Sequence, residues 1–247
     1  MRGRRPMPTI LFDDGGLARA GGPPPPGPSQ ATHNECSSLP LTLGRVASRD
    51  DNLAVGSVEI VEYDQSWPDA FRDAASRLRM TLGDSASRID HIGSTSVAGL
   101  ASKDVIDIQV SVGQGTDLDG VARELEKAGW TLRPGINRDH DVPGLSADEP
   151  AQQKRFLNEP PGSRRVNIHV RVTGQANQRY PLLFRDYLRA DSFSAQAYAR
   201  LKRDLALLLQ DDSGRYADMK DAACDLIYFA AEDWARAVGW DAGRSDG

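Results

Sequence analysis

The sequence predicts an α/β (α+β) fold in which a small mixed sheet is flanked by helices and followed by a helical C-terminal subdomain. Three observations lead to this prediction. Residues 89–112 read as two strands joined by a turn, residues 166–172 alternate polar and apolar side chains, and residues after 180 change to helical spacing. A region of strands followed by a run of helices is typical of the α+β class.

The other elements are predicted from side-chain periodicity and from turn residues. Residues 58–63 alternate and are predicted to form a strand, and a helix is predicted between Ser66 and Gly83. Residues 134–163 are rich in proline, so we expect a long loop with a short strand near residues 155–157. Further helices are predicted at residues 118–128, 181–188, 195–209 and 216–238.

The two ends of the chain differ in composition from its middle. Residues 1–56 are rich in proline and glycine, so burial cannot offset the entropy cost of ordering them, and we predict a disordered extension. A polyproline ligand for a recognition domain is the alternative. The folded domain is predicted over residues 57–240, with a mixed-sheet core over 57–175 and a helical part over 176–240. Residues 241–247 are predicted to form a disordered tail.

The overall composition excludes several classes of protein. With 39% hydrophobic and 26% charged residues, the 247-residue chain is expected to be soluble and to bury one substantial core. No run of about 18 apolar residues is present, so we expect no membrane partner. Two cysteines provide neither a disulfide framework nor a zinc site, which favours the cytoplasm. The net charge of −5 argues against nucleic acid as a partner.

Residues 89–112 carry the main functional pattern. In the second predicted strand, apolar residues share one face, and Asp107 and Gln109 share the other. A carboxylate on an open strand face, beside a Gly93-Ser94 turn with free backbone N–H groups, can hold a metal–triphosphate. The nucleotidyltransferase fold has this arrangement, with Gly-Ser followed by an Asp-apolar-Asp strand. Gln109 stands where the second carboxylate is expected, and two-metal catalysis needs both carboxylates.

Neighbouring polar residues are candidates for the same site. We predict that Gly93, Ser94 and Thr95 hold phosphate oxygens through backbone N–H groups and hydroxyls, the alternative being an ordinary tight turn. His169 lies on the polar face of the predicted strand 166–172. It is a candidate general base or second metal ligand, and the alternative is a histidine that is hydrogen-bonded at the sheet surface.

Several cations in the helical half are candidate anion ligands. Arg185 and Arg189 share one helix face, which suits phosphate or carboxylate, although pairing with Asp186 is the commoner arrangement. Lys202 and Lys220 each follow a tyrosine by four residues, so the chain repeats a Tyr-x-x-x-Lys pattern. The alternative for each lysine is a solvated helix face.

Taken together, these segments resemble the GrpB family, a branch of the nucleotidyltransferase-like superfamily. The resemblance extends from residue 57 to about residue 236, and it departs at Ala98 and Asp104, where the family usually has proline. The matching segments are Val61-Glu-Tyr-Asp-Gln-Ser-Trp67, His91-Ile-Gly-Ser-Thr-Ser-Val-Ala-Gly-Leu100, Lys103 with Val105-Ile-Asp-Ile-Gln109, Asn167-Ile-His-Val170, Phe184-Arg-Asp-Tyr-Leu-Arg189 and Tyr198-Ala-Arg-Leu-Lys202.

The resemblance implies a nucleotidyltransferase-like core that binds a nucleotide or other phosphate compound with a divalent metal. Asp107 would hold one Mg²⁺ (or Mn²⁺), His169 would be a catalytic base or second ligand, and Lys103, Arg185 and Lys202 would bind anionic oxygens. Nucleotidyl transfer is the expected reaction, and a catalytically inactive nucleotide-binding or partner-binding module is the alternative.

A coenzyme A pathway protein is an expected partner, because GrpB domains also occur fused behind dephospho-CoA kinases in some bacteria. The chain lacks the phosphate-binding loop pattern Gly-x-x-x-x-Gly-Lys-Ser/Thr, so it is not expected to be such a kinase itself.

Overall fold

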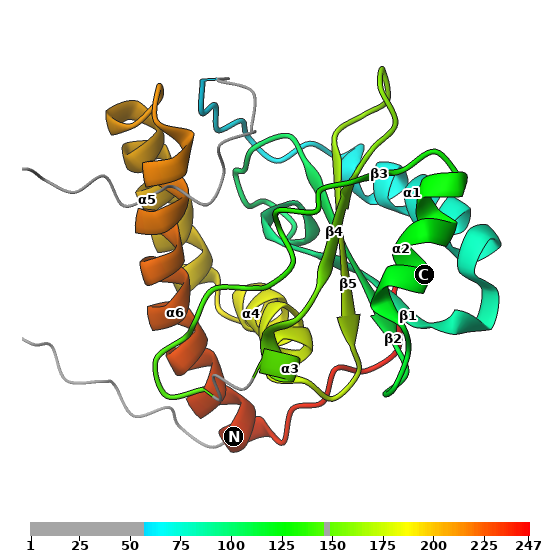
Figure 1. Ribbon diagram of the computed structural model, residues 1–247. Helices are drawn as coiled ribbons and strands as arrows, with labels where there is room; N and C mark the ends of the chain where they lie inside the picture. The colour runs from blue at the N-terminus through cyan, green and yellow to red at the C-terminus, as the bar shows by residue number, and fades with distance from the viewer. Residues whose placement is uncertain (1–56, 146–148) are drawn as a thin grey trace, which may run out of the picture. The chain divides into compact units, whose positions relative to one another are not determined.

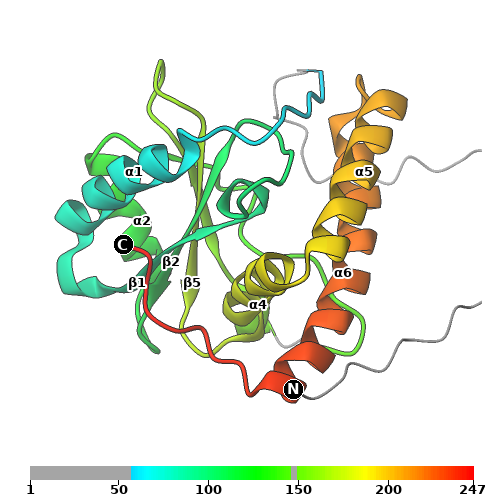
Figure 2. The ribbon, with the colours of Figure 1, turned by 180° about the vertical axis from the view of Figure 1, so that it is seen from behind.

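A computed structural model describes residues 57–145 and 149–247, which form a mixed sheet, helices on both of its faces, and a helical region beside it (Figures 1 and 2). The prediction of disorder for residues 1–56 lies outside the described residues. The strands are β1 (Ala86–Ile92), β2 (Ile106–Val112), β3 (Thr131–Leu132), β4 (Arg155–Asn158) and β5 (Val166–Val172). The helices are α1 (Trp67–Leu82), η1 (Gly83–Ser85), η2 (Ser94–Ser96), α2 (Leu118–Lys127), α3 (Glu149–Gln152), α4 (Ala176–Ala190), α5 (Ser192–Leu208) and α6 (Ser213–Val238).

The five strands form one sheet in the order β1-β2-β5-β4-β3. β1 and β2 are antiparallel, and Ile92 pairs with Asp107 at the end where the connecting turn leaves β1. β2 and β5 are parallel, so Asp107 pairs with Asn167 and Gln109 with His169. β4 adds to β5 in the antiparallel direction. The register therefore places the polar residues of β2 and β5 side by side on one face of the sheet.

The two faces of the sheet are covered differently. Alternate residues of β2 and β5, such as Ile108 and Ile168, are fully buried against α1 and α2 in one apolar core. The opposite face carries the polar residues and is covered by α4, where the side-chain amide of Gln109 donates to the carbonyl of Gln178 over 2.9 Å. The alternation of β2 and β5 that the sequence shows thus separates an apolar face from a polar one.

A helical region follows the sheet. α4 and α5 pack against α6 around a second apolar core that includes Leu183, Phe184, Tyr198 and Tyr228. This is the predicted α+β class, a small mixed sheet flanked by helices with a helical part after it. Among the described residues, the helices are too short or too polar to cross a bilayer.

The structure corrects three element predictions. Residues 58–63 contain only an isolated bridge, between Val61 and Ser102, because this segment meets a loop and does not join the sheet. The helix predicted at 181–188 begins earlier, at Ala176, and contains Pro181. The short strand predicted near 155–157 is present as β4, and the segment that we expected to be a loop also contains α3.

Residues 241–247, for which we predicted a disordered tail, are hydrogen-bonded to the sheet in the structure. This segment runs along β1, which is an edge strand whose outer N–H and C=O groups need partners. The N–H of Gly247 donates to the carbonyl of Ile89 over 3.0 Å, and the N–H of His91 donates to the carboxylate of Asp246 over 3.0 Å. Hydrogen bonds to backbone groups of β1 hold the tail in place. The sequence of the tail contains no pattern that predicts these bonds.

Candidate functional site

The turn after β1 lies directly against the carboxylate of Asp107. Gly93 has a φ of +68°, in the region that favours glycine, and a Cβ at this position would lie 2.4 Å from Oδ2 of Asp107. Both facts require glycine at position 93. Ser94 follows and is half-buried. The predicted juxtaposition of the Gly-Ser turn with the strand carboxylate is therefore present.

Asp107 is partly open to solvent, with 29% of its side chain exposed. Its Oδ1 accepts a hydrogen bond from the side-chain amide of Asn167 over 2.9 Å. Burial raises the pKa of the Asp107 carboxyl, and the Asn167 hydrogen bond acts in the opposite direction. Asp107 is thus a half-satisfied carboxylate that can still accept hydrogen bonds from a ligand.

His169 lies beside Asp107, with its Nε2 4.0 Å from Oδ1. Its Nδ1 is 3.2 Å from the guanidinium of Arg171, which can only donate, so Nδ1 accepts and the ring proton sits on Nε2. Burial and the neighbouring cations Arg171 and Lys154 hold the pKa of His169 well below its usual range. His169 is therefore a neutral hydrogen-bond donor toward the site, and in this state it has no free nitrogen to act as a base.

Gln109, which replaces the second motif carboxylate, is sealed inside the protein. It is fully buried, and its Oε1 accepts a hydrogen bond from Arg171 over 2.8 Å. Arg171 in turn makes two hydrogen bonds to Asp139, each of 2.8 Å, and Lys154 binds the same carboxylate over 2.7 Å. A positively charged guanidinium thus lies where a second metal-binding oxygen would be needed.

Three lysines surround Asp107, from the loop before β2 and from α5 and α6. Lys103, Lys202 and Lys220 each interact electrostatically with this carboxylate. Burial, together with the charge of Lys220, lowers the pKa of Lys103 to about 8 and that of Lys202 to about 7. Lys220 also pairs with Asp221 over 2.6 Å. Below about pH 7 the cluster therefore holds three ammonium groups and two carboxylates, a small excess of positive charge that favours an anionic ligand.

Two of these lysines, Lys103 and Lys202, lie over tyrosine rings. The ammonium of Lys103 lies 4.2 Å from the ring centre of Tyr216, and that of Lys202 lies 4.6 Å from the ring centre of Tyr198. Lys202 also donates a 2.5 Å hydrogen bond to the carbonyl of Ala101. Within the described part of the chain, the ammonium of Lys103 makes no hydrogen bond, so its donors are available to a ligand.

The solvated-face alternative is wrong for Lys202, which is 2% exposed. Lys220, the second lysine of the Tyr-x-x-x-Lys pattern, also interacts with Asp107. The signal for it was in the sequence, because both Tyr-x-x-x-Lys segments contribute to this one cluster. Arg171 and Asp139, which seal Gln109, had no such signal because they meet only in the folded chain.

Two predicted phosphate ligands do not point into the site. Thr95 is 1% exposed, and its hydroxyl is hydrogen-bonded to the carbonyl of Val105 over 3.2 Å and to Nε2 of His91 over 3.0 Å. Arg185 is 2% exposed and binds Asp186 over 2.7 Å and Asp246 over 2.6 Å. Both side chains are used to hold the turn and the tail in place, so neither can hold phosphate.

The donor set around Asp107 does not fit a divalent metal. Mg²⁺ takes oxygen ligands in an octahedral arrangement and usually binds at least one or two carboxylates together with phosphate. Here one oxygen of Asp107 is taken by Asn167, Gln109 is sealed, and the surrounding charges are positive. Among the described residues, no group of three or more histidine, cysteine, aspartate or glutamate side chains is arranged to hold a metal ion.

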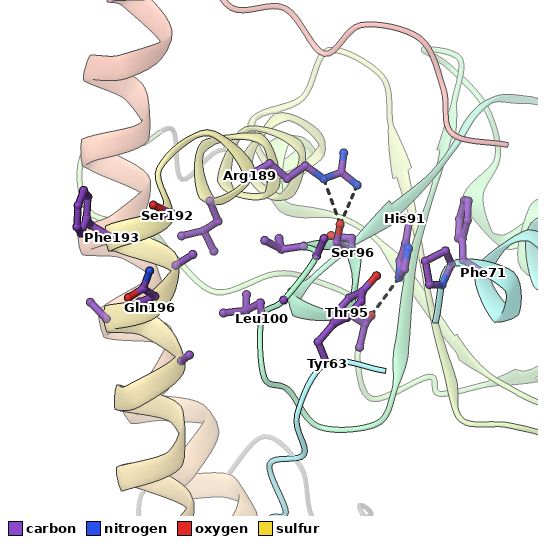
Figure 3. Close-up of a pocket in the computed structure, with 18 of the residues that line it drawn as sticks. Tyr63, Phe71, His91, Thr95, Ser96, Leu100, Arg189, Ser192, Phe193 and Gln196 are labelled. Atoms are coloured by element: carbon purple, nitrogen blue, oxygen red, sulfur yellow. Dashed lines mark hydrogen bonds between the residues drawn. The ribbon is translucent and has the colours of Figure 1, made fainter. Parts of the chain in front are cut away.

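A cavity of about 1220 Å³ lies beside the same turn, but Asp107 does not line it (Figure 3). It lies between α5, the loop after β1 and the start of α1. Three of its arginines are already engaged: Arg189 donates twice to the carbonyl of Ser96, Arg203 pairs with Glu62, and Arg72 pairs with Asp69. Only the Arg189 contact reaches the loop after β1, and Asp107 is not among the lining residues, so the cavity and the Asp107 cluster are separate features.

Comparisons with known proteins agree on one family. The model of the GrpB protein family matches residues 57–229. The dephospho-CoA kinase of Mycobacterium tuberculosis is 34% identical over 200 residues, which are 76% of this chain and 49% of that protein. A UPF0157 protein of Halalkalibacterium halodurans is 35% identical over 171 residues, 69% of this chain and 80% of that one. The chain thus spans about half the length of the dephospho-CoA kinases that it matches.

A solved structure shares the fold. The crystal structure of the conserved protein GrpB from Enterococcus faecalis matches with a TM-score of 0.58 and 30% identity. The match covers 71% of this chain and 99% of that chain. Both the predicted family and the predicted fold class are therefore confirmed.

Proposed function

The chain belongs to the GrpB family, and from this premise we propose that it binds a nucleotide or other phosphate compound without a metal ion. The site is the cluster of Ser94, Asp107 and three lysines between the sheet and helices α5 and α6. The observation that carries the proposal is the placement of Lys103, Lys202 and Lys220 around a single carboxylate. Ammonium groups in a partly buried setting are strong ligands for phosphate.

Each side chain has a specific task in this proposal. The ammonium of Lys103 donates to phosphate oxygens. The hydroxyl of half-buried Ser94 is hydrogen-bonded to Tyr198, so it donates to the ligand by exchanging that partner. Asp107 accepts from a hydroxyl or amino group of the same ligand, and Nε2 of His169 donates from the sheet face. A ligand with an anionic group and a nearby hydroxyl or amino donor satisfies all four residues. Nucleotides are such ligands.

The same cluster favours the binding module over nucleotidyl transfer. Two-metal transfer needs carboxylates that hold both ions about 4 Å apart. Gln109 occupies the position of the second carboxylate, and its Oε1 accepts a hydrogen bond from Arg171. Lysines can neutralise phosphate charge without a metal, so the missing carboxylate is no obstacle to binding.

A coenzyme A pathway enzyme is the partner that we propose for this module. Matched relatives bear the name dephospho-CoA kinase, and the chain corresponds to about half of their length. A domain that is joined to an enzyme in one chain can act beside it as a separate protein in another organism. Co-purification with the organism's own dephospho-CoA kinase tests this partner.

Isothermal titration calorimetry tests the ligand proposal. ATP, GTP, CTP, UTP and pyrophosphate are titrated into the full chain and into Lys103→Gln. The loss of one charge-assisted hydrogen bond should weaken binding about tenfold or more. Lys127→Gln is the matched control, because Lys127 lies on α2 with its side chain 71% exposed. If none of the five compounds binds, or if both variants bind like the native chain, the proposed site is wrong.

A further inference from the structure

Helix α6 has a second face that packs against nothing in the described structure. Its buried face is formed by residues such as Tyr216, Cys224 and Tyr228. The opposite face is exposed, and its large apolar side chains are Met219, Leu226 and Phe229, which are 47%, 73% and 40% exposed. We call this face the α6 stripe and define it by Arg215, Met219, Ala222, Leu226, Phe229 and Asp233, all of them exposed.

The spacing of the α6 stripe is that of a helix–helix seam. Its residues follow one another at intervals of three and four, the pattern that lets two helices interlock side chains along one line. Arg215 and Asp233, of opposite charge, flank the apolar part at its two ends, and Asp233 also pairs with the exposed Arg236 on its own helix. An apolar seam with charged ends is typical of a surface that a second helix covers.

We propose that this second helix is α6 of another copy of the chain, packed antiparallel about a two-fold axis at the level of Cys224. In this register Met219 faces Phe229, the small Ala222 faces Leu226, and Arg215 faces Asp233. Because a two-fold interface repeats every contact, each of these three pairs occurs twice. Large residues therefore meet each other, a small residue leaves room for a leucine, and every charge at the ends has an opposite partner.

Other arrangements of the same two helices lack this complementarity. A parallel pair would place Arg215 on Arg215 and Asp233 on Asp233. Shifting the antiparallel pair by three residues, so that Arg215 faces Arg236, would also bring like charges together. Like charges that face each other across an interface oppose association and select against these registers.

The dimer would leave the proposed ligand site open. Tyr216, which contacts Lys103, belongs to the buried face of α6 and not to the α6 stripe. Association and ligand binding therefore involve opposite faces of one helix, and each can be tested without the other.

Sedimentation of the full chain over a range of concentrations tests the inference. The native chain should form a dimer as concentration rises, and Leu226→Glu should sediment as a monomer at the same concentrations. Arg215→Asp and Asp233→Arg should each raise the dimer dissociation constant about tenfold, because each creates two repulsive pairs. Arg123→Asp, on exposed α2, is the control and should leave the dimer unchanged.

Mixing the two charge variants gives the decisive result. One copy then carries acids at both ends of the α6 stripe and the other carries bases, so only the mixed dimer has opposite charges at every contact. The mixture should dimerise about as well as the native chain, although neither variant does so alone. A native chain that is monomeric at every concentration, or a mixture no better than the separate variants, would overturn the inference.

Discussion

Gly93 allows the backbone of the turn to lie directly against the carboxylate of Asp107. Any side chain at this position would adopt an unfavourable φ and would also contact the carboxylate of Asp107. Gly99, in the same loop, has a φ of +78° but open space around it. Alanine at position 99 would therefore add only backbone strain, whereas alanine at position 93 would add strain and a steric conflict.

We predict that Gly99→Ala lowers the free energy of unfolding by about 1–2 kcal/mol, the cost of a left-handed backbone. Gly93→Ala should lower it by about 3 kcal/mol or more, because strain and contact with Asp107 add. Urea unfolding of both variants measures the difference. Equal losses would mean that the turn does not press on the carboxylate.

We expect Asp107 to lower the stability of the protein at neutral pH. Burial raises its pKa in the folded state, so folding favours the protonated form, and stability is lost as pH rises through that raised pKa. Asp107→Asn should therefore be more stable than the native chain at pH 7, and this advantage should vanish near pH 4. Urea unfolding at the two pH values measures it.

The control for Asp107→Asn is Asp73→Asn, on the exposed face of α1. It should change stability little at either pH. If Asp107→Asn were less stable than the native chain at pH 7, Asp107 would have a structural role instead of a binding role.

Residue types alone could identify part of the site. Gly93, Ser94, Asp107 and Lys103 were predicted from the sequence, and the structure brings them together. Lys202 was predicted too and interacts with Asp107, but its ammonium is buried and bonded to the carbonyl of Ala101. Thr95 and Arg185 were also predicted, but their side chains are hydrogen-bonded inside the protein. Those partners come from distant segments such as the C-terminal tail, so no local pattern could show them.

At the level of elements, periodicity predicted most helices and strands. It succeeded for strands with one apolar face, such as β2 and β5. In each of them, side chains point alternately into the apolar core and toward the polar face of the sheet. It failed at residues 58–63, where the same alternation meets a loop. Alternation reports which side chains can be buried, and it does not report whether a neighbouring strand is there to pair with.

The lysines contributed by different elements should make ligand binding depend on pH. Burial, then the charge of Lys220, lowers the pKa of Lys103 to about 8 and of Lys202 to about 7, so both lose their charge as pH rises through these values. Affinity for pyrophosphate should fall from about pH 6 to about pH 9. Lys202→Gln should flatten the profile, whereas Lys127→Gln should leave it unchanged; calorimetry across this range gives both curves. A flat native profile would contradict the role of the buried lysines.

For the whole molecule, the site that we propose needs both the sheet and the helical region. The sheet supplies the turn, Asp107 and His169, and the helices supply Lys202 and Lys220. The sequence predicted both parts, but the excess of positive charge between them appears only when they pack together. That excess favours a phosphate compound over a metal ion.

The most direct test is calorimetric titration of ATP, GTP, CTP, UTP and pyrophosphate into the full chain, once with EDTA and once with Mg²⁺. We predict that at least one of them binds in EDTA, and that Mg²⁺ does not increase its affinity. Binding that appears only when Mg²⁺ is present would contradict the account, because Asp107 would then be a metal ligand and the lysines would be secondary.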